Sequence, residues 1–184
     1  FVVEQGIVEA QEEVSLNIPW YSRYDNFRAY SFALPVYRGN ARYRAPLTVS
    51  IDDQQYASEE IVRIQALAAR QLQDQLPGMV VRQILRLIAK EEMRRKMAKE
   101  GGDLGNILAS LYNIASERAD TRSWGTLPDN VQILRMNLPQ GSHQLDMQIA
   151  GKQQQVIVQV NKNRITLVNL TNIGNYTGYQ MINL

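Results

Sequence analysis

Apolar and polar residues alternate along the first third of the chain. The apolar positions recur at every second residue in three runs, which are Val14, Leu16 and Ile18; Tyr30, Phe32 and Leu34; and Leu47, Val49 and Ile51. A period of two indicates strands with one buried face. Pro19, Pro35 and Pro46 lie at or near the ends of these runs, where a missing amide donor does least harm to a sheet. We therefore predict strands over residues 1–57.

The period becomes helical after residue 57. Ser58 fits an N-cap with Glu59 and Glu60 in the first turn, and this first helix is expected to stop near Gln75. Pro77 suits the first turn of a second helix. The apolar members of the second helix are Val81, Ile84, Leu85 and Ile88. The spacing thus predicts two helices joined close to Pro77.

Gly101 and Gly102 are expected to end the second helix. A third helix is predicted after these two glycines. Asp103 fits the N-cap of this third helix. Its apolar face has members spaced at three and four residues, namely Leu104, Ile107, Leu108, Leu111, Ile114 and Ala115. We interpret residues 58–121 as a helical insertion.

Strand periodicity returns after Trp124. The apolar runs are Val131 and Ile133; Leu145, Met147 and Ile149; and Val156, Val158 and Val160. Turns are expected at 139–141, 151–152 and 161–163. The length fits one domain or two closely packed ones. The fold class predicted is α+β, an antiparallel β-sheet or sandwich with a three-helix insertion in a single domain, with strands at 1–57 and 126–184.

Composition narrows the possible chemistry. The chain has 184 residues, no Cys and a net charge of only +2, which is too small to attract a polyanion from a distance. Its one histidine, His143, is interpreted as an exposed or hydrogen-bonded surface residue. The adjacent carboxylate pairs are better explained by turns and helix starts than by a catalytic dyad, and they are Asp52 with Asp53, Glu59 with Glu60, and Glu91 with Glu92. We therefore expect no enzyme activity, no catalytic residue, no metal site and no cofactor.

Two groups of residues are candidates for an interaction surface. The second predicted helix carries basic residues four apart, and the first strand region carries aromatic residues interleaved with arginines, a composition typical of protein interfaces. The candidate residues are Trp20, Tyr21, Arg23, Tyr24, Arg38, Tyr43, Arg82, Arg86, Lys90 and Arg94. An ordinary solvated helix face, or aromatics divided between the core and a sheet edge, is the alternative interpretation. A third candidate is the stretch 165–184, which has no charge, because an uncharged edge strand is open to pairing.

One segment resembles a known family. The run Glu117–Pro128, with Arg122, Ser123 and Trp124 at its centre, continues through Val131–Met136 and Leu138–His143. It resembles the C-terminal region of an uncharacterised family of bacterial envelope lipoproteins, with further similarity at Leu34–Tyr37 and Ala45–Leu47. The residues themselves favour a structural role for Trp124, as an anchor of the junction in the core, over a ligand site.

The resemblance implies a secreted parent protein with a lipidated N-terminal Cys and a helical, repeat-like region. We therefore expect this chain to be the C-terminal part of a longer protein, periplasmic and associated with the outer membrane. The function predicted is a non-catalytic structural or assembly component of a cell-envelope complex, with other envelope proteins or a second copy as partner. The alternative is a regulatory module that recognises a cell-wall polymer or activates an envelope enzyme. No nucleic-acid partner is expected.

Overall fold

The computed structural model describes residues 1–22, 25–39, 42–116 and 119–184, with the backbone alone at residues 18, 20–22, 25–30, 94 and 97–116. The elements are β1 (Val2–Gln5), β2 (Glu12–Ser22), β3 (Asp25–Val36), β4 (Thr48–Ile51), β5 (Gln54–Ala57), β6 (Glu59–Arg63), α1 (Ile64–Ser116), β7 (Asn130–Ile133), β8 (Gly141–Ile149), β9 (Lys152–Val160), β10 (Thr166–Ile173) and β11 (Tyr176–Asn183). They form two compact units. The first comprises residues 1–9, 39–68 and 124–184, and the second comprises residues 10–38 and 69–123.

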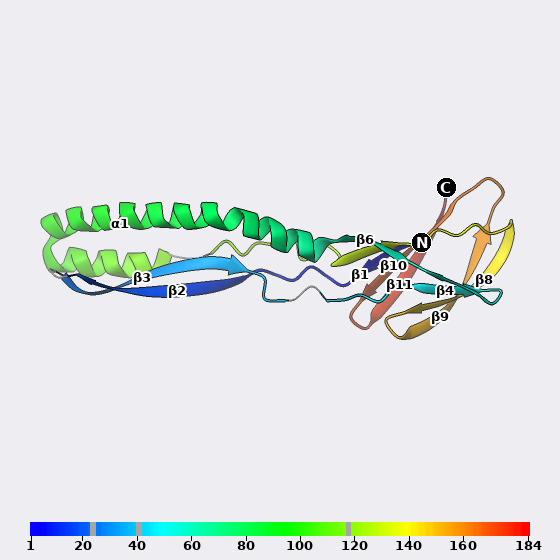
Figure 1. The fold of residues 1–184 in the computed structure, drawn as a ribbon. Helices are drawn as coiled ribbons and strands as arrows, with labels where there is room; N and C mark the ends of the chain where they lie inside the picture. Colours follow the sequence, from blue (N-terminus) through cyan, green and yellow to red (C-terminus); the bar gives the residue numbers. More distant parts are fainter. Residues whose placement is uncertain (23–24, 40–41, 117–118) are drawn as a thin grey trace. The chain divides into compact units, whose positions relative to one another are not determined.

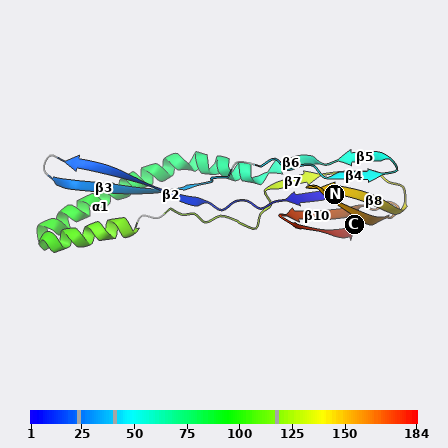
Figure 2. The ribbon, with the colours of Figure 1, turned by 90° about the horizontal axis from the view of Figure 1, so that it is seen from below.

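The first unit contains two sheets (Figures 1 and 2). One has five strands in the order β11-β10-β1-β7-β6, and the other has four in the order β5-β4-β8-β9. β1 pairs in parallel with β10, whereas the remaining pairs in both sheets are antiparallel. Strands from distant parts of the chain therefore meet in one sheet.

The core of the first unit lies between these two sheets. Leu145, Met147 and Ile149 of β8 are buried, and their neighbours along the strand are exposed. They belong to one buried cluster with Val168 and Leu170 of β10. Side chains two residues apart point to the same face of a strand, so the apolar alternation of β8 supplies one wall of the core. The strands predicted from this alternation at residues 145–149 and 156–160 are confirmed as β8 and β9.

The second unit combines a hairpin with the helical element. β2 and β3 are antiparallel, with Glu12 opposite Val36 at the open end. The Gln83 side-chain amide in α1 donates a hydrogen bond to the Ala33 carbonyl of β3, which places the hairpin against the helix. The ribbon of α1 doubles back on itself in Figures 1 and 2. α1 and the hairpin thus pack together through an amide and a buried alanine.

The predicted three-helix insertion is wrong. The described residues form three sheets and one helical element, so the fold is β-rich. The helix begins at Ile64, because Glu59–Arg63 form β6 and find their backbone partners in β7. Pro77 lies inside α1 and does not divide it, although it removes one backbone donor from the helix. Whether the two compact units form one domain stays a prediction.

Ser58, expected to cap a helix, instead joins two strands through buried hydrogen bonds. Its N–H donates to the Leu47 carbonyl at 2.8 Å, and its hydroxyl accepts from the Leu47 N–H at 2.8 Å. The same hydroxyl donates to Oε1 of Gln132 at 2.5 Å. Ser58 and Gln132 are both buried. The serine therefore links the β5–β6 junction to β7.

Replacing Ser58 by alanine is expected to lower the free energy of unfolding by about 1–3 kcal/mol, because it leaves a buried glutamine oxygen without its hydroxyl donor. Urea unfolding followed by circular dichroism measures the change. A Ser142→Ala variant, on the exposed side of β8, serves as the control and is expected to match the parent. Equal stability of both variants and the parent would contradict a structural role for the Ser58 hydroxyl.

An ion pair lies where the chain enters α1. The Asp129 carbonyl accepts hydrogen bonds from the N–H groups of Ile64 and Gln65, at 2.8 and 3.4 Å. Its carboxylate accepts from Nε of Arg44 at 3.0 Å, with the aspartate side chain 6% exposed. Gly6 has a positive φ of 69°, and a Cβ at this position would collide with the Arg44 guanidinium. Glycine therefore suits both the backbone conformation and the close approach of the arginine.

Candidate interaction surface

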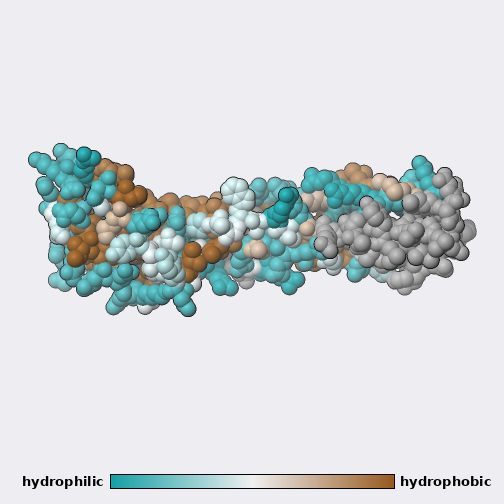
Figure 3. Space-filling model, turned by 180° about the vertical axis from the view of Figure 1, so that it is seen from behind, coloured by the Kyte–Doolittle hydropathy of each residue, from teal (hydrophilic) through white to brown (hydrophobic). Residues whose placement is uncertain are grey.

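Four apolar side chains of α1 face solvent at helical spacing. Val81, Ile84, Leu85 and Ile88 are 54%, 44%, 59% and 62% exposed. Residues three and four apart lie on one side of a helix, so these side chains form a stripe, which we call the α1 stripe. In Figure 3 a short brown patch lies on the upper rim at this end of the molecule, with teal residues on both sides. A single exposed leucine is ordinary, whereas a continuous apolar stripe marks a contact site.

The opposite side of this part of α1 is also largely apolar. Met79, Val80 and Leu87 are half-buried, on the side from which Gln83 reaches β3. A helix that is apolar around most of its circumference is usually covered on both sides. In the described part of the chain, only the side that carries Gln83 is covered. The α1 stripe is therefore a face that lacks a covering element within this structure.

One of the predicted basic residues, Arg82, borders the α1 stripe. It is exposed on the flank beyond Leu85, one turn before that residue, whereas Arg86, seven residues after Met79, is exposed on the other side of the helix. Neither forms an ion pair within the described residues. Lys90 is half-buried and engaged in an interaction, and Arg94 is described by its backbone only. The stripe thus combines an apolar centre with one positive residue, Arg82, on its border.

The aromatic candidates are placed only in part. Trp20 and Tyr21 belong to β2, described there by the backbone alone, and the predictions for Arg23 and Tyr24 lie outside the described residues. Two further candidates are described fully. Arg38 pairs with Glu12 at 2.8 Å beside the β2–β3 hairpin, and Tyr43 is 79% exposed in the segment before β4. Arg38 belongs to the second unit and Tyr43 to the first.

Two of the carboxylate pairs lie in a turn and in a strand, and His143 forms a surface hydrogen bond. Asp52 and Asp53 both have positive φ, 47° and 60°, and form the turn between β4 and β5, which confirms their interpretation as turn residues. Glu59 and Glu60, expected at a helix start, lie in β6 instead. His143 hydrogen-bonds to the Pro139 carbonyl at 2.7 Å through Nε2, as predicted for a surface histidine. Among the described residues, no cluster of three or more acidic or histidine side chains is placed to hold a metal ion.

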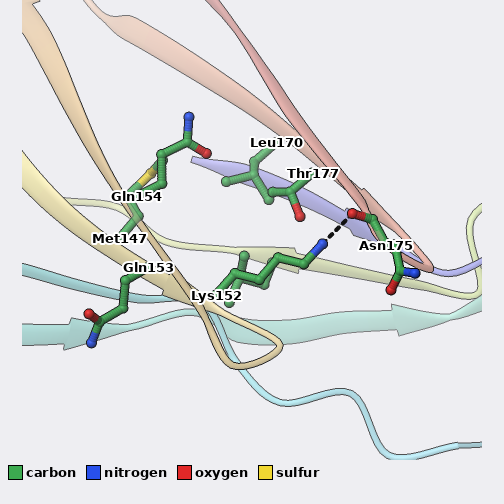
Figure 4. A pocket seen from close by; sticks show the side chains of 8 residues that line it. Met147, Lys152, Gln153, Gln154, Leu170, Asn175 and Thr177 are labelled. Atoms are coloured by element: carbon green, nitrogen blue, oxygen red, sulfur yellow. Dashed lines mark hydrogen bonds between the residues drawn. The ribbon is translucent and has the colours of Figure 1, made fainter.

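A small pocket opens between the β8–β9 turn and the β10–β11 turn (Figure 4). Its volume is about 230 Å³, and Met147, Leu170 and Thr177 contribute to its lining. The Lys152 ammonium donates a hydrogen bond to the Asn175 carbonyl across it. The lining offers amides, a hydroxyl and one ammonium that is already bonded, without a carboxylate or imidazole. This pocket therefore lacks the acid–base pair that general catalysis requires.

The part of the resembling segment at residues 119–127 is largely exposed. Trp124 is 78% exposed, so the prediction that it anchors the junction in the core is wrong. The Arg122 side chain donates two hydrogen bonds to Asp120, at 2.8 and 2.7 Å, and its amide donates a third at 3.2 Å. These bonds, the side-chain ones above all, lower the pKa of Asp120 to about 2. Asp120 and Arg122 thus pair with each other in an exposed part of the segment.

The chain matches no family model, and comparisons with curated proteins and with solved structures find no similar protein. The resemblance to bacterial envelope lipoproteins therefore stays a prediction. Within the described residues, no helix has the length and apolarity needed to cross a membrane.

The α1 stripe was missed as a surface, because its residues were interpreted as the apolar members of a helix. A signal was present in the sequence. Apolar residues occupy most positions from Met79 to Ala89, on more than one side of the helix. Such a segment has more apolar surface than one neighbouring layer covers, which points to a second contact.

Proposed function

We propose that this protein is a non-catalytic structural or assembly component of a bacterial cell-envelope complex, acting through protein–protein contacts. The observation that carries the proposal is the uncovered α1 stripe beside Arg82. The envelope setting, the periplasmic location and the lipid anchor of the parent protein rest on the resemblance of residues 117–143. They are part of the same proposal.

The α1 stripe offers enough surface to drive association. Full burial of a valine, leucine or isoleucine side chain stabilises by about 1.5–3 kcal/mol. Ile84 and Ile88 are 44% and 62% exposed, so covering the rest of each contributes about 1 kcal/mol. Val81 and Leu85 are similar, which gives a few kcal/mol in total before the entropic cost of association. A partner that covers the whole stripe is therefore favoured over one that touches it at one point.

The chemistry of the surface defines the partner. An apolar stripe with i, i+3, i+4 and i+7 spacing is complementary to an amphipathic helix laid along it. Arg82 lies on one border, without an ion-pair partner in the described chain, so a helix with an Asp or Glu on that flank is favoured. We therefore expect an amphipathic partner helix with one acidic border.

A designed peptide tests this surface. A helical peptide with a leucine stripe and a glutamate flank is expected to bind the full chain, measured by calorimetry. An Ile84→Lys/Ile88→Lys variant is expected to bind it about thirtyfold more weakly, because two apolar contacts are replaced by charges. The matched control is Gln71→Lys/Gln75→Lys, which adds the same charge at the same spacing to exposed positions of α1.

The charge border is tested with the same peptide carrying lysines in place of the glutamates, which we expect to bind at least about tenfold more weakly. Equal affinity of the first peptide for the stripe variant and the control variant would show that the α1 stripe is not the contact.

The assembly role is tested in cells. A photo-crosslinking residue at Ile88 of the full-length parent is expected to capture a helical segment of one envelope protein, identified by mass spectrometry. The same residue at Gln73, an exposed position of α1, serves as the control. Capture of a cell-wall polymer at Ile88 would favour the regulatory binding module instead. Indistinguishable products at the two positions would contradict both roles for this face.

A further inference from the structure

β11 is the outermost strand of the five-stranded sheet. It pairs with β10 through eight consecutive residues, from Tyr176 opposite Ile173 to Asn183 opposite Thr166, without a bulge. The Tyr176, Tyr179, Met181 and Ile182 side chains are 65%, 37%, 38% and 46% exposed. A long and regular outer strand offers its free backbone groups to another strand.

This edge also lacks the usual protection against pairing. The stretch 165–184 contains no charged residue and no proline. β6, the outer strand at the opposite side of the same sheet, has a bulge between Glu60 and Val62 and carries three charged side chains, Glu59, Glu60 and Arg63. Charges, prolines and bulges are the devices that keep sheet edges from pairing. One edge of this sheet is therefore blocked and the other is open.

The hydrogen bonds at the end of the strand fix which backbone groups of β11 point outward. The Leu184 N–H donates to the Ile165 carbonyl at 2.8 Å, and the Ile165 N–H donates back at 3.3 Å. Such bonded pairs alternate along an antiparallel ladder with pairs whose N–H and C=O groups face away. Counting from this pair, the outward groups belong to Thr177, Tyr179, Met181 and Asn183.

We propose that β11 pairs antiparallel with β11 of a second copy of this chain, about a two-fold axis at Gln180. In this register Tyr179 lies opposite Met181 of the second copy, and Thr177 lies opposite its Asn183. All four outward residues then exchange backbone hydrogen bonds with the second strand. The two five-stranded sheets become one continuous sheet.

The side chains of this register are self-complementary. A tyrosine opposite a methionine is a favourable sulfur–aromatic neighbour. On the other face, Ile182 of the second copy lies opposite Gly178, over which the Tyr176 ring already leans, and adds apolar contact to that ring. No two like charges meet in this symmetric pairing, because the strand has none. A register centred on Tyr179 would use only three of the four outward residues, since Asn183 would then face the Asn175 turn.

This pairing is independent of the α1 stripe. It uses the first compact unit alone, whereas the stripe belongs to the second. The variants below leave α1 unchanged, so failure of one proposal leaves the other standing.

A disulfide tests the register, since the chain has no other cysteine. In a Gln180→Cys variant the two cysteines form a non-hydrogen-bonded pair with Cα atoms about 4.5 Å apart, within disulfide range. In a Tyr176→Cys variant of the same strand, the two cysteines lie eight residues apart along the ladder, about 27 Å. Mild oxidation is expected to crosslink the first variant into a dimer and to leave the second monomeric on non-reducing gels.

A second measurement uses noncovalent dimers. Met181→Pro removes an outward N–H without touching the β10 ladder, and we expect it to raise the dimer dissociation constant in sedimentation about thirtyfold, because one hydrogen bond per copy is lost. Met181→Ala keeps the amide, and a smaller rise is expected. Equal crosslinking of both cysteine variants, no crosslinking of Gln180→Cys, or a parent chain that stays monomeric would each overturn the proposal.

Discussion

Replacing Leu145 by alanine is expected to lower the free energy of unfolding by about 3–5 kcal/mol, close to the upper limit for removing a buried leucine. The side chain is 0% exposed in the cluster that joins β8 to β10. Truncation removes the transfer free energy of the lost carbons and leaves a cavity that two hydrogen-bonded sheets close only in part. Urea unfolding monitored by circular dichroism gives the change.

The matched control is Ile157→Ala in the neighbouring strand β9. Ile157 is 66% exposed, so its truncation is expected to cost less than about 1 kcal/mol. Both variants remove an apolar side chain from the four-stranded sheet, and they differ in the face from which it is removed. A similar loss in both would show that the core does not lie between the two sheets.

Replacing Asp129 by alanine is expected to lower the free energy of unfolding by roughly 2–4 kcal/mol. The carboxylate is the ion-pair partner of Arg44, whose side chain is 28% exposed and packs against Gly6. Removing the acid leaves a partly desolvated guanidinium without its countercharge. The free-energy cost of this unpaired charge exceeds the net stabilisation that the intact ion pair provides. The same urea titration measures this loss.

An exposed pair of the same chemistry provides the control. Asp120 accepts hydrogen bonds from Arg122, with side chains 62% and 91% exposed. Solvent screens this pair, so Asp120→Ala is expected to leave the unfolding midpoint unchanged. If the two alanine variants behaved alike, burial of Asp129 would not account for its contribution.

The two proposed contacts depend on different physical interactions. The α1 stripe associates through burial of apolar side chains, with Arg82 setting the preferred charge of the partner. The β11 edge associates through backbone hydrogen bonds, with side chains setting the register. High salt is therefore expected to weaken the charge preference at α1 more than the pairing of β11.

Much of the strand arrangement is readable from residue spacing. Because side chains alternate across a strand, Leu145, Met147 and Ile149 mark β8 and its buried face without knowledge of any other part of the chain. The turn at Asp52 and Asp53 can also be predicted from the sequence, because aspartate tolerates positive φ. Both features depend on a few neighbouring residues.

Residue spacing gave wrong predictions where a segment forms backbone hydrogen bonds with a strand far away in the sequence. Residues 59–63 have the pattern of a helix start, yet they pair with β7, some seventy residues later. The Ser58 hydroxyl forms hydrogen bonds with Leu47 and Gln132 and does not cap a helix. A local pattern carries no record of a strand that arrives from so far along the chain. The parallel pairing of β1 with β10 was hidden for the same reason.

The candidate surface shows the same division. The sequence correctly placed the apolar residues Val81, Ile84, Leu85 and Ile88 at helical spacing, but their exposure followed only from the folded chain. Trp124 was expected inside and lies outside. Periodicity reports which residues share a face, because backbone geometry is local. Whether that face is covered depends on which other segment packs there, and this is a property of the whole chain.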